Sequence, residues 1–225
     1  MKRLISLLVT LLLLAVLAVP QGRIGTPTGG GISDFVTETF TEATSTTLAS
    51  HTGEVGATWT LHPSYGNTVI VDASIDRAYA SSTSSTAYYA SGTPSSANYY
   101  VQVTVTVASL PFTGSAGPAG RMDTTANTQY GFRLRDGTSW QLFKLVTGTL
   151  TQLGSESTNN IPTVGQSRTL KLVMTGDQIS GYVEGTLEVG PITDMAITAA
   201  GKAGIRLANP MDVSTGFHLD NFSAR

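Results

Sequence analysis

The sequence predicts an all-β domain, a two-sheet antiparallel sandwich of the jelly-roll type, and three observations support this prediction. Apolar residues recur at every second position in several short runs, glycine-containing pairs separate these runs, and no long stretch has helical periodicity. The clearest run is Tyr99–Leu110, in which four valines alternate with glutamine and threonine. A β-branched stripe with a period of two indicates a strand that is buried on one face only.

The segment Thr169–Gly190 shows how turns organise the chain. Apolar and polar residues alternate on both sides of Gly176-Asp177, which predicts a β-hairpin because a tight turn favours residues with positive φ. The same pattern places Gln129–Arg135 and Ser139–Val146 on the two sides of Asp136-Gly137. Each such hairpin buries one face, so a second sheet has to cover it.

The remaining segments are predicted as short strands joined by polar loops. The strands are expected at Asp34–Glu42, Ala57–Leu61, Thr68–Val71, Arg77–Ala80, Leu150–Leu153, Thr186–Val189, Ala203–Leu207 and Phe217–Ala224. The low-complexity segment Ser81–Ser96 is interpreted as a solvated excursion, or alternatively as a binding loop with Tyr88 and Tyr89 at its tip. Pro111–Gly120 is interpreted as a turn region because it is rich in glycine and proline.

The N-terminus carries the signature of an export signal at residues 1–20. Lys2 and Arg3 precede the apolar run Leu4–Val19, and Val16–Ala18 resembles a small-residue cleavage site. The run is short for a membrane-spanning helix. The alternatives are an uncleaved membrane anchor and a helix buried in a self-assembled particle.

Composition limits the classes of function. Residues 21–33 are rich in glycine, proline and threonine and are expected to form a linker to a domain at 34–225. Charged residues make up 12% of the chain and the net charge is −2, so nothing indicates a nucleic-acid partner. The chain has no cysteine, which excludes disulfides and thiolate metal sites. The expected location is extracytoplasmic, either secreted or surface-associated.

Three segments resemble a known family in their order and spacing. Tyr130–Ser155 contains an arginine strand and an Asp-Gly turn, Thr169–Asn209 contains a hairpin followed by Gly-Lys-Ala-Gly-Ile, and His218–Ala224 contains Asp-Asn-Phe. With Glu38-Thr39-Phe40 as the first strand, Thr37–Arg225 resembles the laminin-G-like and concanavalin A-like jelly rolls. The resemblance implies that fold and a choice among glycan-binding, adhesion, surface and glycoside-hydrolase domains. The Glu-x-Asp-x-Glu motif of the family's glucanases is not found.

A sugar site requires aromatic faces and planar polar groups, and the central hairpins offer both. The candidate ligand-binding residues are Tyr130, Arg133, Arg135, Trp140 and Tyr182. If Phe132 and Leu134 belong to the core, the arginines that alternate with them point to the opposite face. The alternative is that Trp140 and the tyrosines fill the space between the sheets.

The sequence also offers candidate residues for a metal site and for catalysis. The sandwich modules that this sequence resembles often tie their terminal strands with calcium, which implies Glu38 and Asp220 as candidate ligands; alternatively Asp220 caps a turn. No cofactor is expected to be required. Glu184 and Glu188 are the nearest carboxylate pair for glycoside hydrolysis, although both resemble ordinary acids beside turns. The histidines have no metal-ligand spacing.

The leading hypothesis is an exported, non-catalytic jelly-roll module that binds a glycan or another surface polymer. The first alternative is a structural or adhesion protein of a cell-surface or virion assembly, which would retain its apolar N-terminus as an anchor. The second is a divergent glycoside hydrolase.

Overall fold

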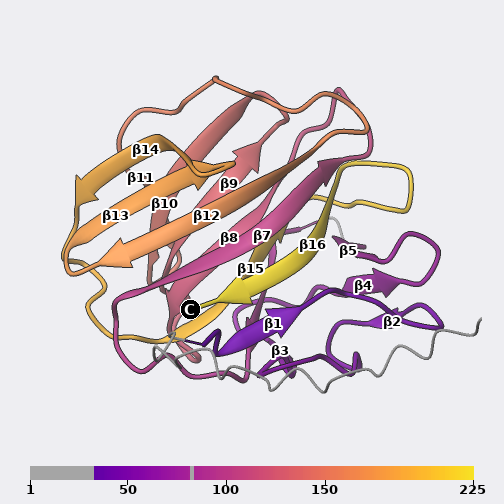
Figure 1. Ribbon diagram of the computed structural model, residues 1–225, viewed down its shortest axis with the longest axis horizontal. Helices are drawn as coiled ribbons and strands as arrows, with labels where there is room; N and C mark the ends of the chain where they lie inside the picture. Colours follow the sequence, from indigo (N-terminus) through magenta and orange to yellow (C-terminus); the bar gives the residue numbers. More distant parts are fainter. Residues whose placement is uncertain (1–32, 82–83) are drawn as a thin grey trace, which may run out of the picture. The chain divides into compact units, whose positions relative to one another are not determined.

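The computed structural model describes residues 33–81 and 84–225, and all regular elements in these ranges are β-strands (Figure 1). Among the described residues, no helix has the length and apolar character needed to cross a membrane. The predicted signal or anchor segment, and all of the predicted linker except Ser33, lie outside these residues.

The strands form two antiparallel sheets. The nine-stranded sheet has the order β14 (Thr186–Thr193), β13 (Gln178–Val183), β12 (Ser167–Thr175), β7 (Tyr99–Val107), β16 (Phe217–Ala224), β5 (Arg77–Ala80), β4 (Val69–Asp72) and β2 (Thr46–Thr47), and β1 (Val36–Glu38) pairs with β16. The seven-stranded sheet has the order β11 (Thr149–Gln152), β10 (Ser139–Val146), β9 (Gln129–Arg135), β8 (Ser115–Met122), β15 (Lys202–Ala208), β6 (Thr86–Ala90) and β3 (Trp59–Leu61). In Figure 1 the strands of one layer run in front of those of the other, which confirms the predicted sandwich.

The core lies between the sheets and follows the predicted alternation. The valines of β7 have no exposed surface, whereas Tyr100, Gln102 and Thr104 between them are half-buried. Phe132 and Leu134 on β9 belong to the same apolar cluster as these valines. Both sheets therefore contribute their inner faces to one core.

The Asp136-Gly137 pair forms the tight turn that the sequence predicts. Both residues have positive φ, 51° and 67°, as the central residues of a mirror-image turn require, and Thr138 N donates to the carbonyl of Arg135 at 2.9 Å. The turn fixes the register between β9 and β10, which pairs Trp140 with Leu134 and Gln141 with Arg133. The side chains of the first pair consequently face inward and those of the second pair outward.

Two loop predictions were wrong. Ser81–Ser96 contains strand β6, and Tyr88 at its centre is 2% exposed and packs in the core, so it is not at a loop tip. Pro111–Gly120 contains most of strand β8, which lies between β9 and β15. Proline and glycine are tolerated there because the paired residues of β8 and β9 skip Gly117 and Pro118, where proline has no N–H to donate.

Candidate functional site

The outer face of the seven-stranded sheet differs from that of the nine-stranded sheet. Along β7 the outward-facing residues are mostly half-exposed, whereas near the centre of the seven-stranded sheet Gln129, Gln141 and Phe143 are 1%, 4% and 1% exposed although they face away from the core. Polar groups are seldom buried on the outside of a sandwich unless other side chains cover them. This face is therefore the first place to look for a site.

Small residues form the floor of this face. The register pairs Gly204 of β15 with Ala119 of β8, Ala119 with Gly131 of β9, and Gly131 with Phe143 of β10. A Cβ atom added to Gly131 would lie 2.2 Å from Cζ of Phe143, so the phenyl ring lies directly on the glycine backbone. Because these positions carry no side chain larger than a methyl group, large groups can lie flat against the sheet.

Two arginines and two aromatic rings lie over this floor, and we call Tyr65, Arg133, Phe143 and Arg206 the arginine–aromatic cluster. The Cζ atom of Arg133 lies 4.8 Å from the Phe143 ring centroid, and that of Arg206 lies 5.6 Å from the same centroid. Arg206 Cζ is also 5.9 Å from the ring of Tyr65, which belongs to the loop between β3 and β4. Both guanidinium groups are thus held by cation–π contacts.

Arg133 makes its hydrogen bonds to neutral partners. Its Nε donates to Oε1 of Gln141 at 2.8 Å, its Nη2 donates to the same oxygen, and its Nη1 donates to Oγ of Ser115 at 3.2 Å. Burial, and to a lesser extent the charge of Arg206, lower the pKa of Arg133 to about 10. The guanidinium therefore stays charged at neutral pH.

Arg135 lies at the rim of this face and is paired with acids. Its Nη1 lies 2.7 Å from Oε1 of Glu156, and its Nε lies 3.3 Å from Oδ2 of Asp136. Nε2 of Gln141 also donates to Glu156, at 2.7 Å. Burial alone would raise the pKa of Glu156, but hydrogen bonds from Ser139 and Arg135 lower it more, so the carboxylate is charged.

A cavity of about 180 Å³ lies beside Arg133. Its lining residues come from β8, β9, β15 and the turns that adjoin them, and they are Thr113, Gly114, Ser115, Arg133, Arg135, Asp136, Ala208 and Asn209. Gly114 N donates to Oδ1 of Asp136 at 2.9 Å, which fixes the wall of the cavity. The cavity supplies space next to the arginines for a small polar group.

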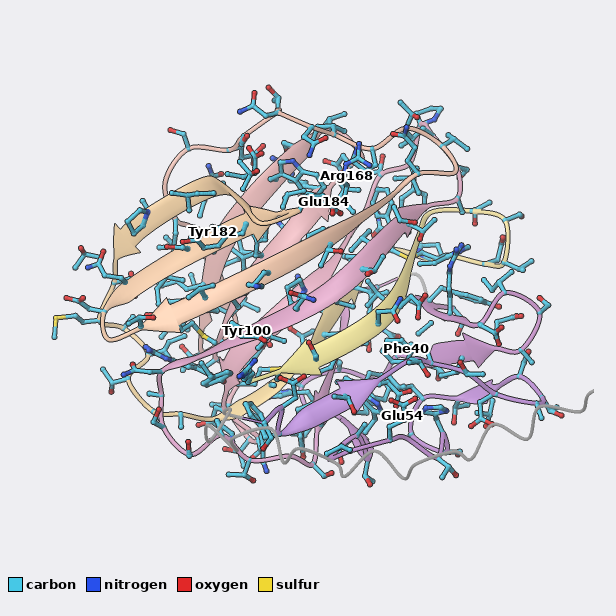
Figure 2. All side chains as sticks on the ribbon, viewed as in Figure 1. Phe40, Glu54, Tyr100, Arg168, Tyr182 and Glu184 are labelled. Atoms are coloured by element: carbon cyan, nitrogen blue, oxygen red, sulfur yellow. The ribbon has the colours of Figure 1, made fainter. Side chains whose placement is uncertain are left out.

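The predicted binding residues do not all lie on one surface, and this corrects the sequence analysis. Trp140 and Tyr130 have no exposed surface and belong to the core between the sheets, so they present no face to a ligand. Tyr182 lies on β13 of the nine-stranded sheet (Figure 2), whereas Arg133 lies on β9 of the seven-stranded sheet, so their outer faces are on opposite sides of the sandwich. Only Arg133 and Arg135 share the predicted surface.

The sequence analysis missed Arg206, Phe143, Gln141 and Tyr65. The alternation within Lys202–Ala208 places Arg206 opposite the apolar Ile205 and Leu207, and this signal could have identified it. The position of Tyr65 in a loop carries no comparable signal.

A second depression, of about 250 Å³, lies on the outer face of the nine-stranded sheet. Its lining residues are Tyr100, Lys171, Val173, Tyr182 and Gly185. Nζ of Lys171 lies 4.6 Å from the ring centroid of Tyr100, and Figure 2 shows Tyr100 and Tyr182 on neighbouring parts of this face. Fewer of its groups are buried than in the arginine–aromatic cluster.

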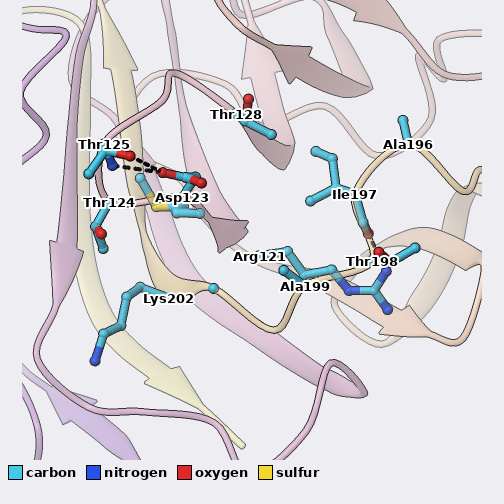
Figure 3. Close-up of a pocket in the computed structure, with 12 residues that line it drawn as sticks. Arg121, Asp123, Thr124, Thr125, Thr128, Ala196, Ile197, Thr198, Ala199 and Lys202 are labelled. Carbon is cyan, nitrogen blue, oxygen red and sulfur yellow. Dashed lines mark hydrogen bonds between the residues drawn. The ribbon is translucent and has the colours of Figure 1, made fainter.

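A larger cavity, about 520 Å³, lies at one end of the sandwich (Figure 3). Its charged groups are already engaged: Nη1 of Arg121 donates to the carbonyl of Ile197 at 2.8 Å, and Oδ1 of Asp123 accepts from Thr125 N and Oγ1. Lys202 donates to the carbonyl of Ser91 at 2.7 Å. These contacts stabilise the loops at this end and leave few charges for a ligand.

The predicted calcium ligands do not fit a shared ion. Glu38 is 2% exposed and points into the sandwich, where Oε1 accepts from Phe40 N at 2.7 Å and Oε2 accepts from Trp59 Nε1 at 3.2 Å. Nε2 of His51 lies 2.9 Å from the same Oε2. Asp220 pairs with Thr104 and faces outward, so the two carboxylates do not converge. Within residues 33–81 and 84–225, no group of three or more His, Cys, Asp or Glu side chains is arranged to hold a metal.

The two candidate catalytic acids are engaged separately. Glu184 lies in the turn after β13 and accepts a hydrogen bond from Thr169 N. Oε2 of Glu188, on β14, accepts from Oγ of Ser157 at 2.6 Å. Each carboxylate therefore has a contact that stabilises a turn or loop.

Comparison of the fold with solved structures identifies similar domains, although no family model matches the sequence and no curated protein matches it. The carbohydrate-binding module CBM66 from Bacillus subtilis is 16% identical, with a TM-score of 0.60, and the match covers 74% of this chain and 94% of that one. A Bacillus subtilis protein of unknown function with a galectin-like fold is 9% identical, with a TM-score of 0.57, over 84% and 98% of the two chains. The described domain is thus a jelly-roll sandwich of the concanavalin A-like and galectin type, as the sequence resemblance implied.

Proposed function

We propose that this domain is a lectin-like carbohydrate-binding module and that its ligand binds at the arginine–aromatic cluster. The observation that carries the proposal is the outward-facing set of planar polar and aromatic groups on a floor of glycine and alanine. The planar polar groups can bond to sugar hydroxyls, and the half-buried ring of Tyr65 can contact ring C–H groups. Phe143 is 1% exposed, so its role is to hold the two guanidinium groups in place. The similarity in fold to a carbohydrate-binding module supports the same conclusion.

The arginines are suited to this role by their rigidity. Arg133 is fixed by Gln141, Ser115 and the ring of Phe143, so little side-chain entropy is lost when a ligand binds. A guanidinium presents its donors in a fixed fork that two neighbouring oxygens of a sugar can accept.

The proposal includes a location outside the cytoplasm, where polysaccharide ligands are accessible. It is supported by the basic and apolar N-terminal segment, Lys2 to Val19. Cleavage of this segment would release the module, whereas retention would display it on a membrane. N-terminal sequencing of the mature protein distinguishes a secreted module from an anchored adhesion or assembly protein.

Binding to a panel of neutral and acidic polysaccharides tests the function. We expect at least one polymer to bind, and Arg133→Ala and Phe143→Leu to weaken that binding about tenfold, the effect of losing about 1.4 kcal/mol. Arg168→Ala is the matched control, since Arg168 lies on β12 of the other sheet (Figure 2). Thermal unfolding shows whether each variant is folded. Absence of binding to the whole panel, or loss only with Tyr182→Ala, would contradict the proposal.

A further inference from the structure

Arg206 is the arginine of the arginine–aromatic cluster whose terminal nitrogens have no partner among the described residues. Its side chain is 9% exposed, and its Nε donates to Oη of Tyr65 at 3.4 Å. Its Nη1 and Nη2 make no hydrogen bond or ion pair to any residue that the structure describes. A guanidinium is seldom buried to this degree without a partner, because removing a charge from water is costly.

Arg121 shows how this chain satisfies a buried arginine that has a structural role. Arg121 is 2% exposed, and its guanidinium donates to three backbone carbonyls, those of Ala97, Ile197 and Gly176, at 3.0, 2.8 and 2.8 Å. Arg206 lacks any such set of acceptors. The comparison indicates that its terminal nitrogens are available to a ligand.

The acids near the cluster do not neutralise it. Glu156 and Asp136 are the carboxylates closest to the Arg133 end, and both are paired with Arg135 at the rim. Arg133 itself donates to neutral oxygens only. The chain as a whole has a net charge of −2, so its long-range field would not attract an anionic polymer, and any attraction would come from this local pair of cations.

We propose that the site is selective for an acidic glycan and that Arg206, with Arg133 beside it, binds the carboxylate or sulfate group of the sugar. This inference rests on the proposed carbohydrate-binding function and specifies its class of ligand. The fork of a guanidinium matches two oxygens of a carboxylate or a sulfate, and such charge-assisted hydrogen bonds are about twice as strong as neutral ones. The anion would supply the acceptors that the protein does not provide.

Two pairs of polymers with matched backbones test the inference. In the first, polygalacturonate is compared with its methyl ester, and in the second, dextran sulfate is compared with dextran. We expect the wild type to bind at least one charged member about tenfold or more tightly than its neutral counterpart, as the loss of a charge-assisted bond predicts. Selectivity in the first pair identifies a carboxylate as the ligand group, and selectivity in the second identifies a sulfate.

Variants of Arg206 locate the selectivity. Arg206→Gln is expected to remove the preference for the charged polymer, and Arg206→Lys to retain part of it, because lysine keeps the charge but not the fork. Arg168→Ala changes the net charge by the same amount as Arg206→Gln on the opposite sheet and is expected to retain the full preference. Thermal unfolding confirms that the variants are folded.

Several outcomes would overturn the inference. Equal binding within both polymer pairs would exclude anion selectivity but leave the proposed carbohydrate binding in place. An equal loss in Arg206→Gln and Arg168→Ala would show general electrostatic attraction rather than a site at Arg206. No binding to any of the four polymers would also reject the acidic-glycan inference, whereas a neutral ligand found in the polysaccharide panel would still support the proposed function.

Discussion

The phenyl ring of Phe143 lies against the backbone of Gly131 on the neighbouring strand. The contact is so close that a Cβ atom at Gly131 would lie only 2.2 Å from Cζ of Phe143. The ring is held there by Arg133 and Arg206. We therefore expect Gly131→Ala to displace the ring, destabilise the domain by about 1–3 kcal/mol as overpacking does, and weaken glycan binding. Urea unfolding and calorimetric titration measure the two effects.

Gly66→Ala is the control for this prediction. Gly66 lies in the same loop as Tyr65, and a Cβ atom there would meet no atom within 4 Å. The control is expected to change stability by no more than about 0.5 kcal/mol and to bind normally. If Gly131→Ala binds as tightly as the wild type, the position of Phe143 does not matter for the ligand.

Trp140 is expected to contribute to stability and not to ligand contact. It is fully buried, and its Nε1 donates to the carbonyl of Asn159 at 2.7 Å. Trp140→Ala should cost about 3–5 kcal/mol, the usual cost of removing a large buried aromatic side chain. Tyr182→Ala, on an outer face, should cost about 1 kcal/mol or less. Thermal and urea unfolding measure both values, and a loss of binding by a fully folded Trp140→Ala protein would contradict this assignment.

The sequence predicted the fold better than the site, and the reason is the range of the interactions involved. The alternation of Phe132, Arg133 and Leu134 is local, so the face on which Arg133 lies could be predicted from strand geometry. The division of strands between two sheets depends on pairings between distant segments. The sequence does not reveal these pairings, so it predicted one surface for Tyr182 and Arg133, which in fact lie on opposite faces of the sandwich.

The arginine–aromatic cluster also depends on pairings between distant segments, which the sequence did not predict. Gly117 lies opposite Arg206, and a Cβ atom on it would lie 2.9 Å from Cα of Arg133, so the two arginines approach each other across a glycine. Because Gly117 falls in a segment rich in glycine and proline, the sequence favoured a turn there, whereas the register with β15 makes it part of a strand. The pairing of Gly117 with a residue of β15 cannot be predicted from the composition of the segment around Gly117.

Lys144 on β10 forms an ion pair with Asp194, the residue that follows β14. We expect this pair to contribute to the stability of the domain. Asp194 also accepts a hydrogen bond from Tyr130 Oη at 2.7 Å. Burial alone would raise the pKa of Asp194, but the hydrogen bonds from Lys144 and Tyr130 lower it more, so the carboxylate is charged at neutral pH. Asp194→Asn should destabilise the domain by about 1–3 kcal/mol, because it leaves a partly buried ammonium without its partner.

The double variant Lys144→Met/Asp194→Asn distinguishes an unpaired charge from a general loss of packing. If the ammonium is the cause, removing it should restore part of the stability that Asp194→Asn loses. Urea unfolding at neutral pH measures the three variants Asp194→Asn, Lys144→Met and Lys144→Met/Asp194→Asn. Additive losses in the double variant would show that the two side chains do not interact.

His218 is expected to make the domain less stable as the pH falls through the ordinary range of histidine. It is 2% exposed, and its Nε2 donates to the carbonyl of Asp212 at 2.8 Å. Burial, with a smaller contribution from the charge of Arg77, lowers the pKa of His218 below its ordinary 6.5. Below that pH the unfolded chain binds a proton that the folded chain does not, so the free energy of unfolding falls, by no more than about 1.4 kcal/mol per pH unit for one group.

His218→Gln isolates this contribution, since glutamine can still donate to Asp212 but does not titrate. We expect the free energy of unfolding of the wild type to fall between about pH 7.5 and about pH 5.5, and that of the variant to fall less. The other titrating groups are the same in both proteins, so the difference between the two pH profiles reports His218 alone. Parallel profiles over this range would show that the buried imidazole takes up its proton as readily as in the unfolded chain.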